Sequence, residues 1–275
     1  MTESPDFLRD AVSRRTFLAR MTAAGLGTAA AVLIAGCGGS SGGGGNSAGY
    51  NPPGLTVFYD KSNFPGIPGA DENTVVLNFA LTLETLEADL YRQALNLASG
   101  KALTTPLPMD VSGYTLSGAF PNGGLDTSSP GSLGSIGYLY LQQYAGVEAA
   151  HRDFLRAYLG PNGVPANPKG YNLGANPPTN LLSLLQLIRK IEETGVTAYL
   201  GAAGFLTDPM LVQIASSIYT TEARHSSGMN YILGLPTGPT GDVGGKQPAA
   251  DVSPDEFEYS QTPSAILSGV RTFFN

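Results

Sequence analysis

The sequence predicts an all-α protein whose main domain is a four-helix bundle built from two copies of one helix pair. Four segments repeat apolar side chains every three or four residues, which is the period of an amphipathic helix. Gly- and Pro-rich connections separate these segments. Each of the two histidines in the chain follows a glutamate by three residues. The expected helices cover residues 71–98, 132–159, 179–202 and 209–233.

The first two helices carry their own start and stop signals. Asp71 or Asn73 can cap the first helix, and Gly160-Pro161 ends the second. The connection between the two helices, residues 99–131, is longer than a simple hairpin needs. Connections of this length tend to be functional or partly unstructured. We expect an insertion that packs over one end of the bundle.

The third and fourth helices must be neighbours, because only a few residues join them. Asp208 can cap the fourth helix with Pro209 at its first helical position, and Gly234 ends it. The connection from the second helix to the third, residues 160–178, is rich in Pro, Gly and Asn. It can extend to about 60 Å, so it is long enough to cross over along the length of the bundle.

A repeated pattern relates the first helix to the third. Glu84 precedes Tyr91 by seven residues, and Glu192 precedes Tyr199 by the same step, with similar apolar residues around both. The second and fourth helices share the Glu-x-x-His pattern. The chain is therefore expected to contain two copies of one helix pair, with a pseudo-two-fold site that binds a metal ion in each half.

The two Glu-x-x-His pairs provide the central evidence for that site. Residues three apart lie on the same face of a helix, so each pair can point at one spot. Two such pairs and one glutamate from each of the other two helices form the ligand set of a two-metal carboxylate site. Two divalent ions would also neutralise four buried carboxylates. The alternative is an exposed ion pair on each helix. The predicted ligands are Glu84, Glu148, His151, Glu192, Glu222 and His225.

Two neighbouring glutamates compete with these choices. Glu193 lies 100° around the helix from Glu192, away from the apolar seam. Glu87 shares the seam with Glu84, but Gly195 occupies the corresponding position in the third helix. Glu87 is therefore either an additional carboxylate at or beside the site, or an outward-facing side chain.

Four tyrosines fall near the predicted ligands along the helices. Each is expected to be a buried aromatic side chain with a satisfied hydroxyl group. Hydrogen bonding to a metal ligand, or carrying an electron, is the alternative role, and Tyr91 and Tyr199 are the two candidates for a position beside the ligands. The four residues are Tyr91, Tyr144, Tyr199 and Tyr219.

The N-terminal residues are expected to address the protein rather than to fold. The segment with Arg14 and Arg15 looks like a twin-arginine export signal, and the apolar stretch after it is short for a membrane span. Residues 33–37 resemble a bacterial lipobox that ends in Cys37, the only cysteine. We expect residues 1–36 to be removed and Cys37 to carry a lipid. A signal peptide cut elsewhere and an uncleaved N-terminal anchor are the alternatives.

Four regions follow from these patterns, and composition limits their partners. The chain carries 22 acidic and 15 basic side chains, for a net charge of −7. This balance argues against nucleic acid as a partner, because phosphate binding relies on basic surfaces. The expected partners are instead the twin-arginine export machinery and a membrane of the cell envelope. The regions are a signal peptide at 1–36, a Gly-rich tether and lead-in at 37–70, the bundle at 71–234, and a loop with a short helix at 235–275.

The helical motifs resemble those of the ferritin-like superfamily. The segments from Leu77 to Tyr91 and from Glu192 to Ala202 are most similar to bacterial exported ferritin-like domain proteins of the desiccation-related type. The resemblance implies a di-iron or di-manganese centre, with iron favoured. In such a centre Glu148 and Glu222 would bridge or chelate the metals, and each histidine would bind one ion.

Two classes of function follow from this resemblance. The first is a di-metal oxidoreductase that acts on O2, H2O2 or Fe2+, with ferroxidase, peroxidase or catalase-like activity. The second is a non-catalytic protein of the cell envelope that sequesters metal or protects against desiccation and other stress. Metal content and turnover would separate the two.

Overall fold

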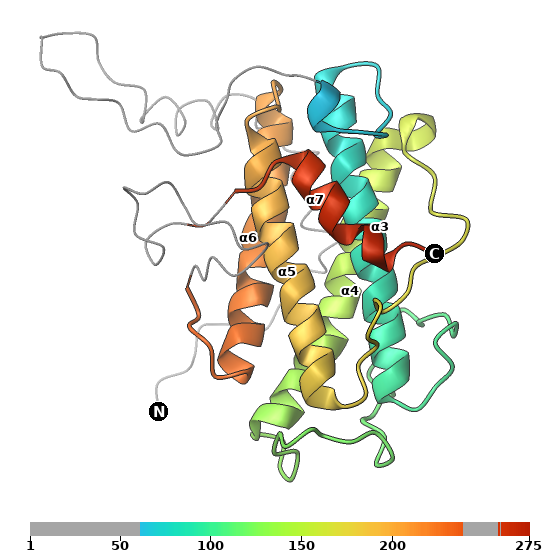
Figure 1. The fold of residues 1–275 in the computed structure, drawn as a ribbon, viewed down its shortest axis with the longest axis vertical. Coiled ribbons are helices and arrows are strands. Elements are labelled where there is room, and N and C mark those ends of the chain that lie inside the picture. Colours follow the sequence, from blue (N-terminus) through green and yellow to red (C-terminus); the bar gives the residue numbers. More distant parts are fainter. Residues whose placement is uncertain (1–60, 239–257, 259) are drawn as a thin grey trace, which may run out of the picture. The chain divides into compact units, whose positions relative to one another are not determined.

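The computed structural model describes residues 61–238, 258 and 260–275, and these residues form an all-helical fold (Figure 1). The fold class predicted from the sequence is confirmed: the described residues contain no strand, only an isolated antiparallel bridge between Tyr171 and Phe274. The α-helices are α3 (Glu72–Ala98), α4 (Leu133–Leu159), α5 (Leu181–Ala203), α6 (Pro209–Ile232) and α7 (Pro263–Val270). Short 3-10 turns are η2 (Lys61–Asn63), η3 (Gly160–Asn162) and η4 (Arg271–Phe273).

The expected export signal, lipobox and tether lie outside the described residues, which begin at Lys61. Arg14, Arg15 and Cys37 therefore stay predictions. Within the part of the chain that the structure describes, no helix combines the length and hydropathy needed to cross a membrane.

The four long helices form a bundle with one long crossover (Figure 1). Helix α3 packs along α4, and α5 packs along α6, so each predicted helix pair is a hairpin of neighbours. The connection after η3 runs along the length of the bundle before α5 begins, and α4 and α5 therefore point the same way. The short helix α7 packs against α5.

Side-chain caps fix where three of the bundle helices begin. Asp71 accepts a hydrogen bond from the Thr74 amide at 2.9 Å, and Asp208 accepts one from the Met210 amide at 2.8 Å. Asn180 and Ser183 form a reciprocal capping box at the start of α5. These bonds satisfy amides that have no partner within the helix, so they stabilise the first turn of each helix.

The core consists of two apolar clusters, one toward each end of the bundle. The first contains Leu81 and Leu155 together with residues of α7 and η4, and the second contains Leu141 and Leu185. The connection between α3 and α4 packs apolar side chains, among them Phe120, on the second cluster. Between the clusters, at mid-length of the helices, lies a layer of buried acidic side chains.

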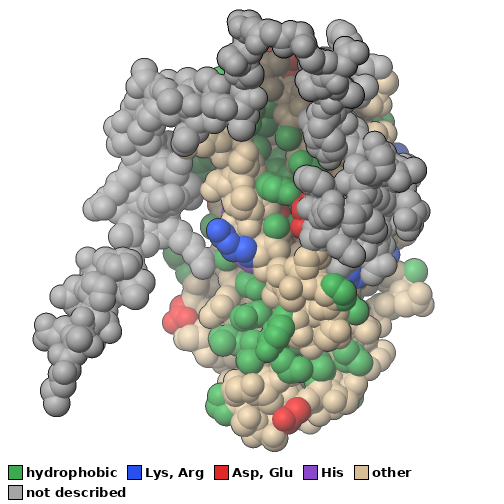
Figure 2. Space-filling model, turned by 90° about the vertical axis from the view of Figure 1, so that its left-hand side faces the viewer, with side chains coloured by type: hydrophobic (Ala, Val, Ile, Leu, Met, Phe, Trp, Pro, Cys, Tyr) green, Lys and Arg blue, Asp and Glu red, His purple; other side chains and the backbone are tan. Residues whose placement is uncertain are grey.

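The surface of the described residues carries few charges on the face shown in Figure 2, where hydrophobic side chains gather on the lower half. The first turns of α4, the end of α6 and the residues just after it contribute exposed large apolar side chains at Leu133, Leu139, Tyr231 and Leu235.

Candidate metal centre

Five glutamates meet in the middle of the bundle, where burial disfavours their charged form. Every bundle helix supplies at least one of them, and four of the five are fully buried. An ionised carboxylate costs several kcal/mol to bury unless an opposite charge or hydrogen bonds compensate. The layer is therefore built around something cationic. The five are Glu84 and Glu87 from α3, Glu148 from α4, Glu192 from α5 and Glu222 from α6.

The predicted ligands form two overlapping groups. In each group, one nitrogen or oxygen atom from every residue lies within 4.8 Å of the others. Glu148 and Glu222 belong to both groups, so the two groups are adjacent and share two carboxylates. One group is Glu84, Glu148, His151 and Glu222, and the other is Glu148, Glu192, Glu222 and His225. The structure thus brings all six predicted residues together.

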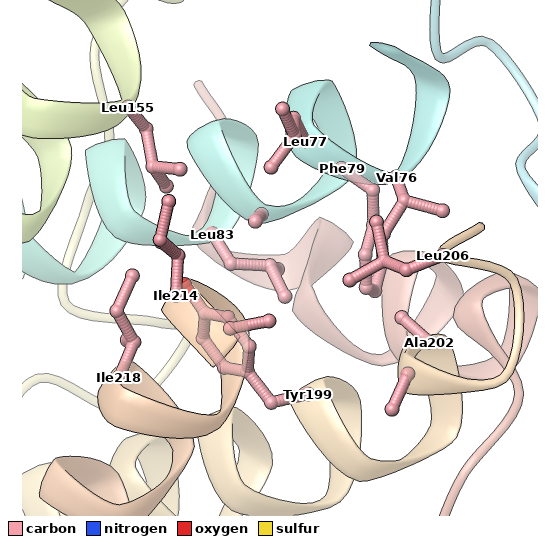
Figure 3. Close-up of a pocket in the computed structure, with 13 residues that line it drawn as sticks. Val76, Leu77, Phe79, Leu83, Leu155, Tyr199, Ala202, Leu206, Ile214 and Ile218 are labelled. Carbon is pink, nitrogen blue, oxygen red and sulfur yellow. The ribbon is translucent and has the colours of Figure 1, made fainter. Parts of the chain in front are cut away.

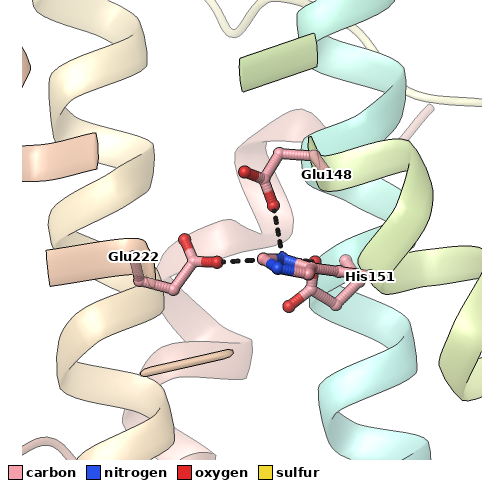
Figure 4. A group of neighbouring side chains, drawn as sticks. Glu148, His151 and Glu222 are labelled. Atoms are coloured by element: carbon pink, nitrogen blue, oxygen red, sulfur yellow. Dashed lines mark hydrogen bonds and ion pairs between the residues drawn. The ribbon is translucent and has the colours of Figure 1, made fainter. Parts of the chain in front are cut away.

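The first histidine faces more acceptors than it can satisfy. Nδ1 of His151 lies 3.0 Å from Glu148, 3.3 Å from Glu222 and 3.4 Å from Glu84. Figure 4 shows Glu148 and Glu222 pointing at the His151 ring from separate helices. One ring nitrogen carries at most one proton, so it cannot donate to three carboxylates at once. A cation among these four side chains would be bound by all of them.

The second histidine repeats this arrangement in the other half. Nδ1 of His225 lies 2.8 Å from Glu148 and 3.3 Å from Glu192, without the angles of a hydrogen bond to either. The Tyr144 ring stacks on the His225 ring, with 3.8 Å between the ring centroids. Stacking holds the imidazole plane in place, so Nδ1 stays directed at the carboxylates. Tyr219, by contrast, packs on the first apolar cluster and is only half-buried.

Buried atoms without hydrogen-bond partners test whether these residues fit a metal. An unsatisfied buried polar atom costs about 1–3 kcal/mol, so a folded core contains few of them unless a ligand is missing. Hard oxygen donors with one imidazole nitrogen per group suit iron or manganese. The residues therefore fit a pair of such ions. The unpartnered atoms are Oε2 of Glu84, Oε2 of Glu87, Oε1 of Glu148, Oε2 of Glu192, both carboxylate oxygens of Glu222, and Nδ1 of His225.

Two tyrosines hold two of the carboxylates by hydrogen bonds that cross between helices. The Tyr199 hydroxyl on α5 donates to Oε1 of Glu84 on α3 at 2.6 Å. The Tyr91 hydroxyl on α3 donates to Oε1 of Glu192 on α5. Burial and the nearby carboxylates raise the pKa of both tyrosines well above the usual range, so both keep their protons. Each bond occupies one oxygen of a glutamate and leaves Oε2 directed into the cluster.

A glycine makes room for the fifth carboxylate. A Cβ atom at Gly195 would lie 3.0 Å from Oε2 of Glu222 and 3.2 Å from Oε1 of Glu87. Contacts this short would push both carboxylates aside. Glu87 is 4% exposed and faces the cluster. Of the two alternatives that the sequence left open, the inward-facing one is therefore observed.

The competing residue of α5 belongs to a different network. Glu193 is also buried, but it accepts hydrogen bonds from the Ser226 hydroxyl at 2.5 Å and from the Asn230 amide at 3.1 Å, both on α6. Arg189 donates to Asn230 at 2.7 Å. This network joins α5 to α6 beside the cluster. The sequence contained no signal for it, because Ser, Asn and Arg at these positions also suit an exposed helix face.

The pKa values of the cluster's titrating groups are shifted in different directions. Burial raises the pKa of Glu222 well above its usual range, and Glu148 and Glu192 raise it further. Burial lowers the pKa of His225, but the charges of Glu192 and Glu148 outweigh this effect and raise it to about 10. Burial alone would raise the pKa of Glu148, yet the two histidines bring it to about 2. A metal ion that binds here must therefore displace protons.

Comparison with known proteins agrees with the fold. The model of the ferritin-like domain family matches residues 72–235, more than half of the chain, from the start of α3 to the end of α6. No curated protein matches the sequence. The matched region contains the five glutamates of the cluster and both histidines. This chain belongs to the ferritin-like domain family.

Proposed function

We propose that the protein binds two iron or manganese ions, with iron favoured, and that it reacts with O2, peroxide or Fe2+. The observation that carries this proposal is the pair of overlapping ligand groups that share Glu148 and Glu222. Because Glu148 and Glu222 belong to both groups, they would hold both ions of a two-metal site. When bound, such a pair supplies electrons to oxygen species or accepts them.

The protein's own residues would prepare that chemistry. His151 and His225 each give one nitrogen to one half, and Glu84 and Glu192 each give their free Oε2. Tyr199 and Tyr91 fix the orientation of these two glutamates through their hydrogen bonds. The two apolar clusters exclude water on both sides of the layer, which strengthens every electrostatic interaction within it.

The cellular setting is part of the proposal. The twin-arginine pattern at Arg14 and Arg15 supports export, and the lipobox-like residues before Cys37 support attachment to a membrane of the cell envelope. Twin-arginine export carries folded proteins, so the bundle can take up its metals before it leaves the cytoplasm. This setting also fits the likeness to exported ferritin-like proteins of the desiccation-related type.

A second function, metal sequestration or stress protection without turnover, is favoured by one observation. Four of the five glutamates are fully buried, and a closed site suits retention of metal more than exchange with a substrate. Under this alternative the same six residues bind the same ions, and only the reactivity differs.

Metal content and turnover together test the proposal. The purified chain should contain iron or manganese, and it should consume peroxide or oxidise Fe2+ faster than free metal. The variants His151→Ala and His225→Ala should each lose one metal ion and the turnover, whereas Asp153→Asn, an exposed carboxylate on the same helix as His151, should keep both ions and the turnover. Two bound metals without turnover would favour sequestration. A metal-free protein unaffected by either histidine variant would rule out the metal centre.

A further inference from the structure

An apolar cavity lies within the first core cluster (Figure 3). The centre of a water-sized sphere can occupy about 20 Å³ of this cavity. Side chains from α3, α4, α5 and α6 point into it, and Tyr199 is the only lining residue whose side chain carries a polar atom. That hydroxyl already donates to Glu84. The cavity is therefore large enough for one small molecule and offers that molecule no free hydrogen-bonding side chain.

The cavity lies one helical turn from the candidate metal centre. Ala80 precedes Glu84 by four residues, so the two lie one above the other on α3. In the same way Leu155 follows His151 by four residues on α4. The cavity is thus the next layer of the bundle beyond the half that contains these two predicted ligands. Tyr199 spans the boundary, since it lines the cavity and donates to Glu84.

A third helix places the cavity at the same level. Ile218 precedes Glu222 by four residues on α6 and lines the cavity wall. Three helices that carry predicted ligands of one group therefore each contribute a cavity-lining residue one turn away.

The internal repeat shows why the cavity lies at this end of the bundle. Since Glu84 corresponds to Glu192, Ala80 corresponds to Ile188, which is fully buried in the second cluster. A small side chain thus lines the cavity where the other repeat has a large one.

Helices α4 and α6 also correspond to each other in the repeat, and α6 has smaller side chains at the cavity than α4 has at the equivalent positions. Since Glu222 corresponds to Glu148, Ala215 corresponds to Leu141 and Ile218 to Tyr144. Tyr144 is the ring that stacks on His225 in the other half. The space beside the Glu84–His151 half is therefore encoded by smaller side chains from both repeats, one on α3 and two on α6.

The chemistry of the cavity restricts its occupant. A cavity lined by hydrocarbon stays dry, because water needs two to four polar partners, and such cavities bind apolar molecules or gases. Hydrogen peroxide needs similar partners, and the lining side chains offer it none. Ala203, Ile214 and Ala215 are only half-buried, so the cavity approaches the surface between α5 and α6.

We infer that the cavity is a dioxygen site, which holds an apolar diatomic gas against the Glu84–His151 half of the metal centre. This inference rests on the proposed function and narrows its substrate from any oxygen species to O2. The Tyr199 side chain lies between the cavity and the Glu84 carboxylate, because it lines the cavity and its hydroxyl donates to Glu84. The dry lining favours O2 over peroxide at this position.

Binding of the gas can be tested without metal or turnover. Dissolved O2 is paramagnetic, so it speeds the relaxation of methyl groups that it contacts. In the metal-free, methyl-labelled full chain, the methyl groups of Ala80, Leu155 and Ile218 should relax faster under O2 than those of Leu141 and Ile188, which are buried at the other end of the bundle. Equal relaxation at both ends would overturn the inference.

Variants that fill the cavity provide the second arm. Ala80→Ile introduces the side chain of the equivalent residue Ile188, and Ala215→Leu introduces that of the equivalent residue Leu141. If one of these variants folds poorly, the other is used. Each should abolish the excess relaxation, whereas Ala157→Leu, at an exposed site on α4, should leave it unchanged. Excess relaxation that persists in a folded, cavity-filled variant would also overturn the inference.

Kinetics of the metal-loaded chain separate this inference from the proposed function. The cavity-filled variants should bind as much metal as the wild type and react with O2 about tenfold more slowly, while their reaction with peroxide stays within about twofold. Equal losses with both oxidants would contradict a dioxygen site. A chain that binds no metal would refute the proposed function, and the relaxation measurement would still decide what the cavity binds.

Discussion

Tyr199 on α5 donates its hydroxyl proton to Oε1 of Glu84 on α3, at 2.6 Å. In the opposite direction, the Tyr91 hydroxyl on α3 donates to Oε1 of Glu192 on α5. A glutamate and the tyrosine seven residues later are about 10 Å apart along one helix, so neither tyrosine serves the glutamate of its own helix. The repeated spacing in the sequence therefore encodes a crossed pair that ties the two helices together and orients one carboxylate in each half of the site.

Removal of either hydroxyl should weaken the half that it supports. Tyr199→Phe leaves Oε1 of Glu84 buried without its partner, at a cost of about 1–3 kcal/mol. We expect metal affinity to fall about tenfold in the half with His151 for Tyr199→Phe, and in the half with His225 for Tyr91→Phe. Calorimetric titration with Mn2+ measures both. Tyr219→Phe, outside the cluster, is the control, and an equal loss there would mean that the crossed bonds have no special role.

A single methyl group at Gly195 should disturb the centre. The new Cβ of Gly195→Ala would lie 3.0 Å from Oε2 of Glu222 and 3.2 Å from Oε1 of Glu87. Both carboxylates would have to shift, and we expect a loss of metal affinity of about tenfold. Gly146→Ala is the matched control, since it lies within α4 with nothing near its added Cβ. That variant should bind metal normally and gain up to about 1 kcal/mol in stability.

The metal-free protein should lose stability as the pH rises above neutral. The pKa of His225 rises from 6.5 to about 10 on folding, and that of His151 also rises well above 6.5. A proton held more tightly in the folded state stabilises fully below pH 6.5, and its contribution disappears as the pH rises through the folded pKa. The raised pKa of Glu222 acts in the same direction. The melting temperature should therefore fall from about pH 6.5 to about pH 10.

Two comparisons check the origin of this pH dependence. The metal-free double variant His151→Ala/His225→Ala should show a flatter decline over the same range, because the tightly held histidine protons are gone. The metal-loaded protein should also decline less, since metal ions replace the protons. A metal-free wild type whose melting temperature rises with pH over this range would contradict the assignment of charge to the histidines.

Replacement of a shared carboxylate should affect both halves at once. Glu222→Gln removes a residue that belongs to both ligand groups, whereas Glu84→Gln removes one that belongs to a single group. We expect Glu222→Gln to reduce metal binding in both halves and Glu84→Gln to spare the half with His225. Metal content by mass spectrometry distinguishes the two. Identical stoichiometries for the two variants would argue against shared carboxylates.

Much of the fold followed from local patterns. The apolar period and the capping residues Asp71 and Asp208 place the bundle helices to within about two residues, because these signals act within one or two turns. The six clustered residues were also predictable, since the Glu-x-x-His spacing fixes a helix face and the repeat identifies Glu84 and Glu192. Each of these signals depends on neighbours in the sequence.

The rest required the packing of helices against one another. The crossed bonds of Tyr91 and Tyr199 depend on how α3 faces α5, which neither helix specifies alone. Gly195 was visible only as a break in the symmetry with Glu87, and the structure shows that one makes room for the other. The apolar cavity depends on side chains from all four bundle helices, so no single segment of sequence reveals it.

The most direct test of the central claim is the number of metal ions that the metal-free chain binds. Fe2+ or Mn2+ would be titrated under anaerobic conditions, and the bound ions counted by native mass spectrometry. The account predicts two ions per chain for the wild type, one for His151→Ala or His225→Ala, and none retained by the double variant. A wild-type chain that binds no ion, or a double variant that still binds two, would contradict the claim that these residues form a two-metal centre.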